Sequence, residues 1–406
     1  MKVKSQLSTT QATYVGLASM LGAGVFVVFG PAAKYSGSLL PLAVLLAAAI
    51  AYLNAMSIAQ LARTVTRAGG AYAYARHYIS NRVGFIAGSA FLVGKLGSTA
   101  AIALTFATFL TPGYETITAI AALVTMTTLN IFGITRTALG SKILALITIG
   151  FLAVIILAAS LTPASAVEPL TPEPLGLLSA AALIFFAFAG YARVATLGSE
   201  VANSSVAIPK AIRLSLGIVV LIYLALAIVL PMQLGRGLAG DLTAIADLTA
   251  LVLPGVDGQV VWVFAASASL GSLLALLAGL GRTASTMAED GELHISLVRR
   301  NSYGVPWLAE SIIALIGSLL VLTNSVEFVV SLSSFCVLIY YAIANWAAYR
   351  QPKADANRPK WLNVLGFLSC AALAFSVPLP AILVGAGGMA ALFVLRQALA
   401  KPGDSR

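Results

Sequence analysis

Glycines cluster in the middle of two long apolar segments of this sequence. One segment carries Gly22-Ala23-Gly24, and the other carries Phe188-Ala189-Gly190-Tyr191. A glycine inside a helix costs up to about 1 kcal/mol, so clustered glycines indicate an unwound turn or a close backbone contact. An unwound turn frees N–H groups that can bind a carboxylate and C=O groups that can bind an ammonium. The alternative is small-residue packing between helices, which is serious in a chain with 35 glycines.

Two cationic side chains lie inside apolar segments and are candidates for a functional charge. Lys95 is near the centre of one segment, and Arg193 follows Tyr191 by two residues. A charge at the bilayer centre costs at least about 2.5–3.5 kcal/mol, so it must face protein or water. Structural roles stay open for both. Lys95 could bond to helix-end carbonyls, and Arg193 could reach the inner interface or pair with Glu200.

The elements that would position these residues are membrane helices. The chain is 60% hydrophobic and only 9% charged, against about 25% charged residues in soluble domains. This composition excludes a disordered chain, a soluble enzyme and a disulfide-stapled secreted domain. A backbone in lipid must satisfy its own hydrogen bonds, so we expect one all-α integral membrane domain over residues 1–406. The predicted spans are 11–33, 39–62, 83–110, 115–133, 138–161, 175–198, 209–232, 259–281, 307–324, 326–349, 361–377 and 379–396.

Most of the basic residues lie between these apolar segments. If both termini are cytoplasmic, most of the 24 Lys and Arg residues fall on the inner side, as expected for a multi-pass protein of the cell membrane. The net charge of +10 is therefore explained by the membrane topology, and no nucleic acid partner is expected. The polar stretch 63–82 has alternating aromatic and basic residues, which is typical of an amphipathic helix at the membrane interface.

Metal and cofactor sites are not expected. Cys336 and Cys370 lie inside apolar segments, where they read as small buried side chains. His77 and His294 lie in distant loops and make at most an incomplete metal site.

Four motifs resemble the amino acid–polyamine–organocation (APC) superfamily and span residues 16–306. Gly22-Ala23-Gly24-Val25-Phe26 resembles its G-[SA]-G-[IV]-F signature in helix 1. Phe188–Tyr191, together with Glu200 and Ile208–Ile212, resembles helix 6 and its following loop. Ala68–Tyr74 resembles the "sGGaYaY" loop, and Met287–Gly291 resembles the "arDG" loop.

The resemblance implies a LeuT-type fold and amino acid transport by alternating access. This fold has twelve transmembrane helices in two inverted five-helix repeats plus two peripheral helices. Helices 1–5 would cover about 11–161, helices 6–10 about 175–349, and the peripheral helices about 361–396. The broken first and sixth helices would then occupy matching places in the two repeats, as binding-site helices do.

The resemblance also implies roles for individual residues. The substrate carboxylate would meet the backbone at Gly22, Ala23 and Gly24. The amino group would meet carbonyls near Ala18, Ser19 and Phe188-Ala189, beside Gly190. Phe188 would cover the site as a gate with Tyr191 nearby, while Glu200 would tie cytoplasmic loops together.

One departure from the family concerns coupling. Many members have a lysine midway along helix 5, and we place that position at Gly150 or Phe151, so the usual coupling group is missing. Lys142 lies at the cytoplasmic end of the same segment, where it reads as an anchor. Desolvation disfavours the charged form of a buried lysine. We therefore expect Lys95 to carry the movable proton and to hold helix 1 when protonated.

The favoured function is secondary active transport of a small neutral amino acid, either as a proton symporter or as an antiporter. A site bordered by two cations and no acids suits a zwitterion. Transport of a small amine or polyamine remains the alternative. The residues disfavour a passive channel, and they disfavour a membrane enzyme because the spans hold no HExxH motif, paired carboxylates or Ser–His pair. The expected partners are the lipid bilayer, a small-molecule substrate and, for a symporter, protons.

Overall fold

The computed structural model describes residues 7–65, 69–133, 138–164, 167–195, 201, 203–256 and 259–399. Over these residues the chain forms helices joined by turns, with an isolated β-bridge between Leu7 and Val201. The all-α prediction is therefore confirmed for the described part of the chain.

Two of the predicted spans are broken at their glycines. The first consists of α1 (Thr9–Met20), α2 (Gly24–Val27) and α3 (Phe29–Ser36). The sixth consists of α9 (Gly176–Phe188), the 3₁₀ turn η2 (Ala189–Tyr191) and α10 (Ala192–Ala195). Both breaks lie where the glycine clusters predict them.

Continuous helices occupy the other predicted spans. They are α4 (Leu40–Ala62), α6 (Asn81–Leu110), α7 (Glu115–Ile131), α8 (Ala138–Leu161), α11 (Ser204–Leu234), α13 (Gln259–Glu289), α14 (Trp307–Val321), α15 (Val326–Arg350), α16 (Lys360–Ala374) and α17 (Leu379–Leu399). Nine spans in the described chain are long and apolar enough to cross a membrane, while α7, α14 and α16 are shorter apolar helices. The largest differences from the predicted boundaries are that α13 continues two turns past residue 281 and that α11 begins five residues before residue 209.

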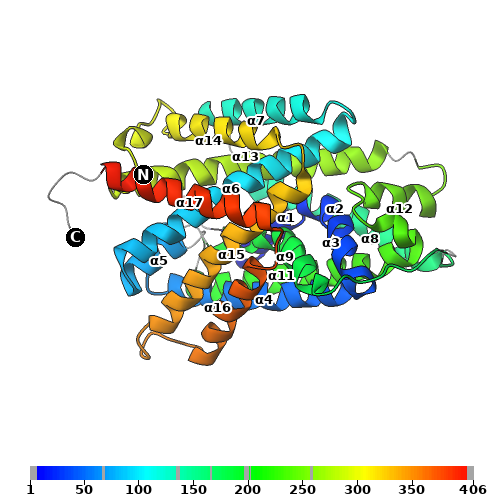
Figure 1. Cartoon of the computed structure of the whole chain (residues 1–406), viewed down its shortest axis with the longest axis horizontal. Helices are drawn as coiled ribbons and strands as arrows, with labels where there is room; N and C mark the ends of the chain where they lie inside the picture. Colours follow the sequence, from blue (N-terminus) through cyan, green and yellow to red (C-terminus); the bar gives the residue numbers. More distant parts are fainter. Residues whose placement is uncertain are drawn as a thin grey trace.

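Short helices join these elements. They are α5 (Ala71–Tyr78), α12 (Ala244–Val252) and the 3₁₀ turns η1 (Gly37–Leu39), η3 (Gly235–Leu238) and η4 (Ile295–Val298). Helix α5 and the C-terminal end of α17 lie at the left of Figure 1, whereas α3 and α12 lie at the right.

Helices α6 and α15 form the centre of the molecule. Helix α6 packs on α15, α13, α7 and α14, and the last two lie side by side along one edge (Figure 1). Glycines permit the close approach of α6 and α15. A Cβ atom at Gly94 would lie 2.9 Å from Cβ of Cys336, and one at Gly97 would lie 3.0 Å from the Val329 carbonyl oxygen. These glycines pack helices together, as expected for small residues at a membrane-helix interface.

A buried polar cluster joins α4, α15 and α16. The Ser57 hydroxyl lies 2.7 Å from Oδ1 of Asn345 and 2.9 Å from Oδ1 of Asn363. Nδ2 of Asn345 donates to Oδ1 of Asn54 at 2.7 Å, and the Cys370 thiol donates to the same oxygen at 3.1 Å. The three helices are thus joined by hydrogen bonds between polar side chains, as expected at membrane-helix interfaces. Both cysteines are buried and free, as predicted.

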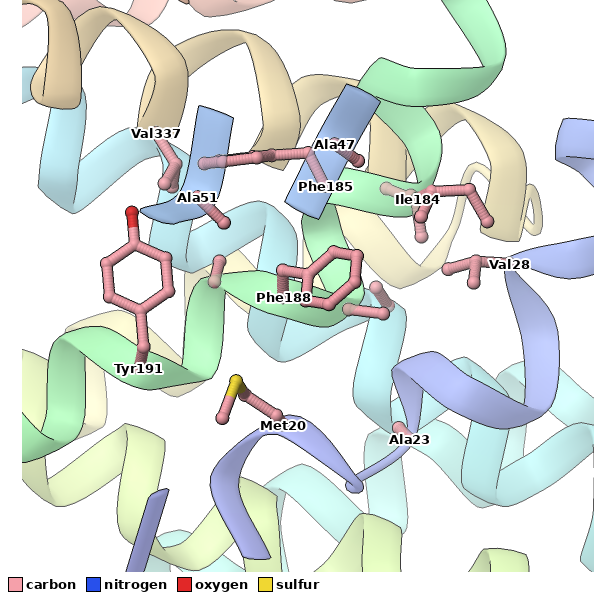
Figure 2. Close-up of a cluster of buried hydrophobic side chains, with 14 of the residues drawn as sticks. Met20, Ala23, Val28, Ala47, Ala51, Ile184, Phe185, Phe188, Tyr191 and Val337 are labelled. Carbon is pink, nitrogen blue, oxygen red and sulfur yellow. The ribbon is translucent and has the colours of Figure 1, made fainter. Parts of the chain in front are cut away.

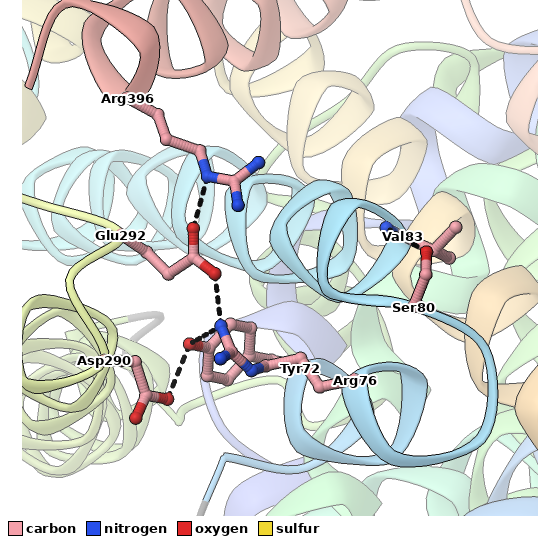
Figure 3. Close-up of polar contacts among 7 residues, drawn as sticks. All are labelled: Tyr72, Arg76, Ser80, Val83, Asp290, Glu292 and Arg396. Carbon is pink, nitrogen blue, oxygen red and sulfur yellow. Dashed lines mark hydrogen bonds and ion pairs between the residues drawn. The ribbon is translucent and has the colours of Figure 1, made fainter. Parts of the chain in front are cut away.

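A second polar cluster joins the loops at one end of the helices (Figure 3). Tyr72 of α5 donates its hydroxyl to Asp290 at 2.7 Å, so two of the family-like motifs are in contact. Arg76 and Arg396 both form ion pairs with Glu292, whose side chain is only 4% exposed. The helix predicted within 63–82 is thus present as α5. Its residues Ala71–Ala75 are buried, and it packs on α6 and α15.

Candidate functional site

The two helix breaks touch each other through their backbones. A Cβ atom at Gly190 would lie 2.3 Å from the Ser19 carbonyl oxygen and 2.7 Å from the Met20 nitrogen. Real Cβ atoms do not approach backbone atoms so closely, so only glycine fits at this position. The sequence alone left open whether these glycines bind a ligand or pack, and at Gly190 they pack one break against the other.

The break in the first helix leaves backbone groups unused. The Leu21 N–H donates to the Leu17 carbonyl at 2.8 Å and ends α1. The N–H groups of Gly22 and Ala23 have no backbone acceptor among the described residues. These are donors of the kind that a carboxylate needs.

Tyr223 of α11 bridges the two breaks and was not predicted. Its hydroxyl donates to the Met20 carbonyl at 2.6 Å and lies 3.4 Å from the Ala187 carbonyl. Its ring packs on Phe188, with ring centroids 4.9 Å apart, and edge-on against Phe29 at 5.8 Å. No motif surrounds Tyr223 in the sequence, so only the fold reveals its contact with the breaks.

Phe188 and Tyr191 are fully buried beside the first break (Figure 2). Phe188 lies on the side of its helix that faces Met20 and Ala23. Tyr191 stacks on Tyr341 of α15, with centroids 5.3 Å apart. The structure therefore brings both aromatic residues to the contact between the breaks.

The exposure of the neighbouring predicted residues differs. Ser19 and Gly190 are partly exposed, whereas Ala18 and Ala189 are buried. The predicted residues of both breaks thus lie together, with some of them reachable from outside the protein core.

The glycines of the first break also pack against other helices. A Cβ atom at Gly24 would lie 3.0 Å from Ala187, and one at Gly22 would lie 2.4 Å from Oγ of Ser272 in α13. The Ser272 hydroxyl is buried without a partner, as is that of Ser269. These serines were missed because single serines in an apolar helix carry no distinctive signal.

Lys95 lies about four turns of α6 from the contact of Phe109 with the first span. It is partly exposed, and no hydrogen bond or ion pair of the described residues involves it. Helices α6 and α2 meet where Phe109 packs on Phe26, with ring centroids 6.0 Å apart. Lys95 precedes Phe109 by about 14 residues, or roughly 21 Å of helix. In this conformation the contact of α6 with the first span, through Phe109 and Phe26, is therefore far from Lys95.

The two positions considered for the missing helix 5 lysine have different surroundings. Gly150 is exposed and faces open space, and Phe151 stacks on Phe264 at 4.2 Å. The buried face of α8 carries no lysine in any case, and its residues are Ser141, Ala145, Thr148, Leu152, Ile155 and Ala159.

Lys142, predicted to be an anchor, has a specific neighbour. Its ammonium lies 5.6 Å from the ring centroid of Tyr14 in α1. This cation–π contact links α8 to α1, the first helix of the first span.

The other two predicted charges are less informative. Arg193 is partly exposed in α10 and has an interaction partner, so it is not a free cation. Glu200 lies outside the described residues. Within the described chain there is no group of three potential metal ligands.

Comparison with known proteins identifies the family. A model of the family described as "Amino acid permease" matches residues 11–405. The chain belongs to the amino acid permease family. An uncharacterised transporter of Mycobacterium tuberculosis is 36% identical over 97% of this chain and 92% of its own length.

More distant relatives are named for their substrates. The branched-chain amino acid permease BcaP of Bacillus subtilis is 27% identical over 84% of this chain and 80% of its own. The serine/threonine exchanger SteT of the same organism is 24% identical over 86% and 83%. This permease is therefore a multi-pass membrane protein that transports amino acids and is not an enzyme.

Proposed function

We propose that this permease is a secondary active transporter of a small neutral amino acid and works by alternating access. The observation that carries the proposal is the backbone contact between the two helix breaks at Gly190 and Ser19. A ligand that binds between broken helices is held by groups that must move when the helices move. Binding and helix rearrangement would therefore be coupled.

The substrate would bind mainly to backbone groups. Its carboxylate would accept hydrogen bonds from the N–H groups of Gly22, Ala23 and Gly24. Its ammonium would bind the carbonyls of Ala18, Ser19 and the Phe188-Ala189 turn. The Met20 carbonyl is already held by Tyr223, so it is not part of this proposal.

Neutral side chains fit the residues around the breaks. Ala18, Ala23 and Ala189 are small and apolar, and Phe188 would cover the bound substrate. The two Bacillus relatives are named for branched-chain amino acids and for serine and threonine, which are neutral. A cationic amino acid transporter of Arabidopsis thaliana is 27% identical over 57% of this chain. A cationic substrate or polyamine is therefore the second candidate.

The proposed topology is twelve transmembrane helices in the plasma membrane, with both termini cytoplasmic. Helices 1–5 and 6–10 would form two inverted repeats of the LeuT type. The corresponding positions of the two breaks support this arrangement. The shorter helices α7, α14 and α16 would complete the twelve.

Lys95 is proposed to carry a movable proton. A lysine among membrane helices is costly when charged, so it can exchange a proton as its surroundings change. Because Lys95 is far from the contact of α6 with the first span, it would act through the helices that pack on α6. Lys95→Met should keep exchange of substrate but lose concentrative uptake driven by an inward proton gradient. If the variant still concentrates substrate, Lys95 is structural.

The substrate assignment can be tested by thermal unfolding of the purified protein. Neutral amino acids, cationic amino acids, diamines and small carboxylates would each be added separately. We expect a concentration-dependent rise in the unfolding temperature with a neutral amino acid only. Stabilisation by a diamine but by no zwitterion would contradict the proposal and favour the second candidate.

A further inference from the structure

A buried carboxylic acid lies away from the helix breaks, between α7, α13 and α14. Glu310 is in the first turn of α14 and is 1% exposed. Its Cγ atom would lie 2.5 Å from a Cβ atom at Gly281 of α13, so the acid is pressed directly against that helix. Oxygen Oε2 has no hydrogen-bond partner.

A second unpartnered oxygen is close to this acid. The amide of Asn130 in α7 lies within hydrogen-bonding reach of the Glu310 carboxyl group. Asn130 is also 1% exposed, and its Nδ2 donates to the Leu274 carbonyl of α13 at 3.0 Å. Its Oδ1 is buried without a partner. Oε2 of Glu310 and Oδ1 of Asn130 are therefore neighbouring acceptors, and neither has a donor among the described residues.

One proton would satisfy both oxygens. A protonated carboxyl group has an O–H donor, whereas an ionised one only accepts hydrogen bonds. An ionised carboxylate without donors in an apolar site costs several kcal/mol, so such a group becomes neutral instead. The arrangement is therefore complete only when Glu310 carries a proton.

The charged groups around Glu310 do not neutralise it by pairing. Helix α13 brings Arg282, which is exposed, and α7 brings the uncharged Asn130. On the α6 side, Leu92 and Leu96 line an apolar cavity of about 90 Å³ together with Ala309 and other apolar residues. Lys95, between these two leucines in the sequence, is the cation of this part of α6. Of the described residues, none forms an ion pair with Glu310.

The connection before α14 brings polar and charged groups of its own. Arg300 is paired with Glu289 at 3.3 Å, while His294 and Arg299 are exposed. Nδ2 of Asn301 donates to the Ile131 carbonyl at 2.6 Å, which covers the end of α7 beside Asn130. Asn301 thus ties this connection to the end of α7, next to Asn130.

We propose that Glu310 and Asn130 form a proton-binding site, in which the neutral carboxyl group donates its O–H to Oδ1 of Asn130. Loss of the proton leaves a buried anion against Gly281, which favours separation of α14 from α13 and movement of the carboxylate toward Arg282. Helix α13 also carries Ser272, which lies against Gly22. Protonation of Glu310 therefore biases the helix that supports the first break.

The consequence for transport rests on the proposed function, but the proton site itself does not. Infrared spectroscopy detects the C=O stretching band of a protonated carboxyl group without any substrate. In the reconstituted full-length protein we expect such a band, which disappears as the pH is raised. It should be absent in Glu310→Gln and retained in Glu289→Gln, the matched variant of an exposed carboxylate in α13.

A second variant guards against misfolding of the first. In Asn130→Leu the carboxyl group loses its acceptor, and the Glu310 band should move to higher frequency while remaining present. Substrate exchange without a pH gradient should depend on pH in the wild type, and this dependence should become weaker in Glu310→Gln. A protonated band that is unchanged in folded Glu310→Gln, or that is missing from the wild type at every pH, would overturn the proton site. Absence of exchange in the wild type would instead count against the proposed function.

Discussion

At the scale of single residues, Gly190 provides the sharpest link between sequence and structure. The Cβ atom of alanine would overlap Ser19 and Met20 backbone atoms, which cannot move away as a flexible side chain can. Gly190→Ala should therefore lower the free energy of unfolding by about 1–3 kcal/mol and abolish stabilisation by substrate. The matched control is Gly150→Ala, where the added methyl group meets open space. Equal substrate stabilisation in both variants would show that the contact between the breaks is not needed.

Tyr223 gives a second prediction at this scale. Tyr223→Phe keeps the ring beside Phe188 but removes the hydrogen bond to the Met20 carbonyl. We expect a loss of about 1 kcal/mol of stability and slower transport, because the inner part of the first span is less firmly held. Thermal unfolding and uptake would be compared with Tyr114→Phe, which alters a loop tyrosine that is 70% exposed.

At the scale of elements, the Glu292 cluster holds α5, the segment after α13 and α17 together (Figure 3). Glu292→Ala would leave Arg76 and Arg396 without their shared partner. Partial exposure of both arginines reduces the cost, so we expect a loss of about 2–3 kcal/mol in the free energy of unfolding. Glu289→Ala, which breaks an exposed pair with Arg300, should change stability by less than about 1 kcal/mol. Similar unfolding curves for the two variants would contradict this account.

Helix α12 gives a prediction about pH. Burial and the neighbouring Asp241 raise the pKa of Asp247 above its ordinary value. The folded state therefore binds this proton more tightly than the unfolded state. The resulting stability is fully present below the unfolded pKa and is lost as pH rises through the folded pKa. Asp247→Asn should flatten the dependence of the unfolding temperature on pH over the acidic range, whereas an unchanged dependence would assign it to other groups.

Much of the element order could be predicted from apolar run length and glycine position, because a membrane restricts the chain to helices. Both breaks and the helix in 63–82 follow from local sequence. The contacts of Tyr223, Ser272 and Glu310 could not be predicted, since they join helices that are far apart in the chain.

At the scale of the whole molecule, the helices form a frame around the broken ones. Helix α6 packs mainly on α13, α14 and α15, whereas the broken helices pack mainly on α4, α8 and α11, with a further contact between α9 and α15. A division of this kind would let the broken helices move against a fixed frame, which alternating access requires. A passive channel would need no such movement.

Counterflow in proteoliposomes tests transport by alternating access most directly. Vesicles preloaded with an unlabelled neutral amino acid would be diluted into medium that contains a trace of the labelled one. We predict transient accumulation of label above its external concentration in the wild type, and none with Gly190→Ala. Entry of label that is unaffected by preloading and rises linearly with concentration would contradict the account and indicate a channel.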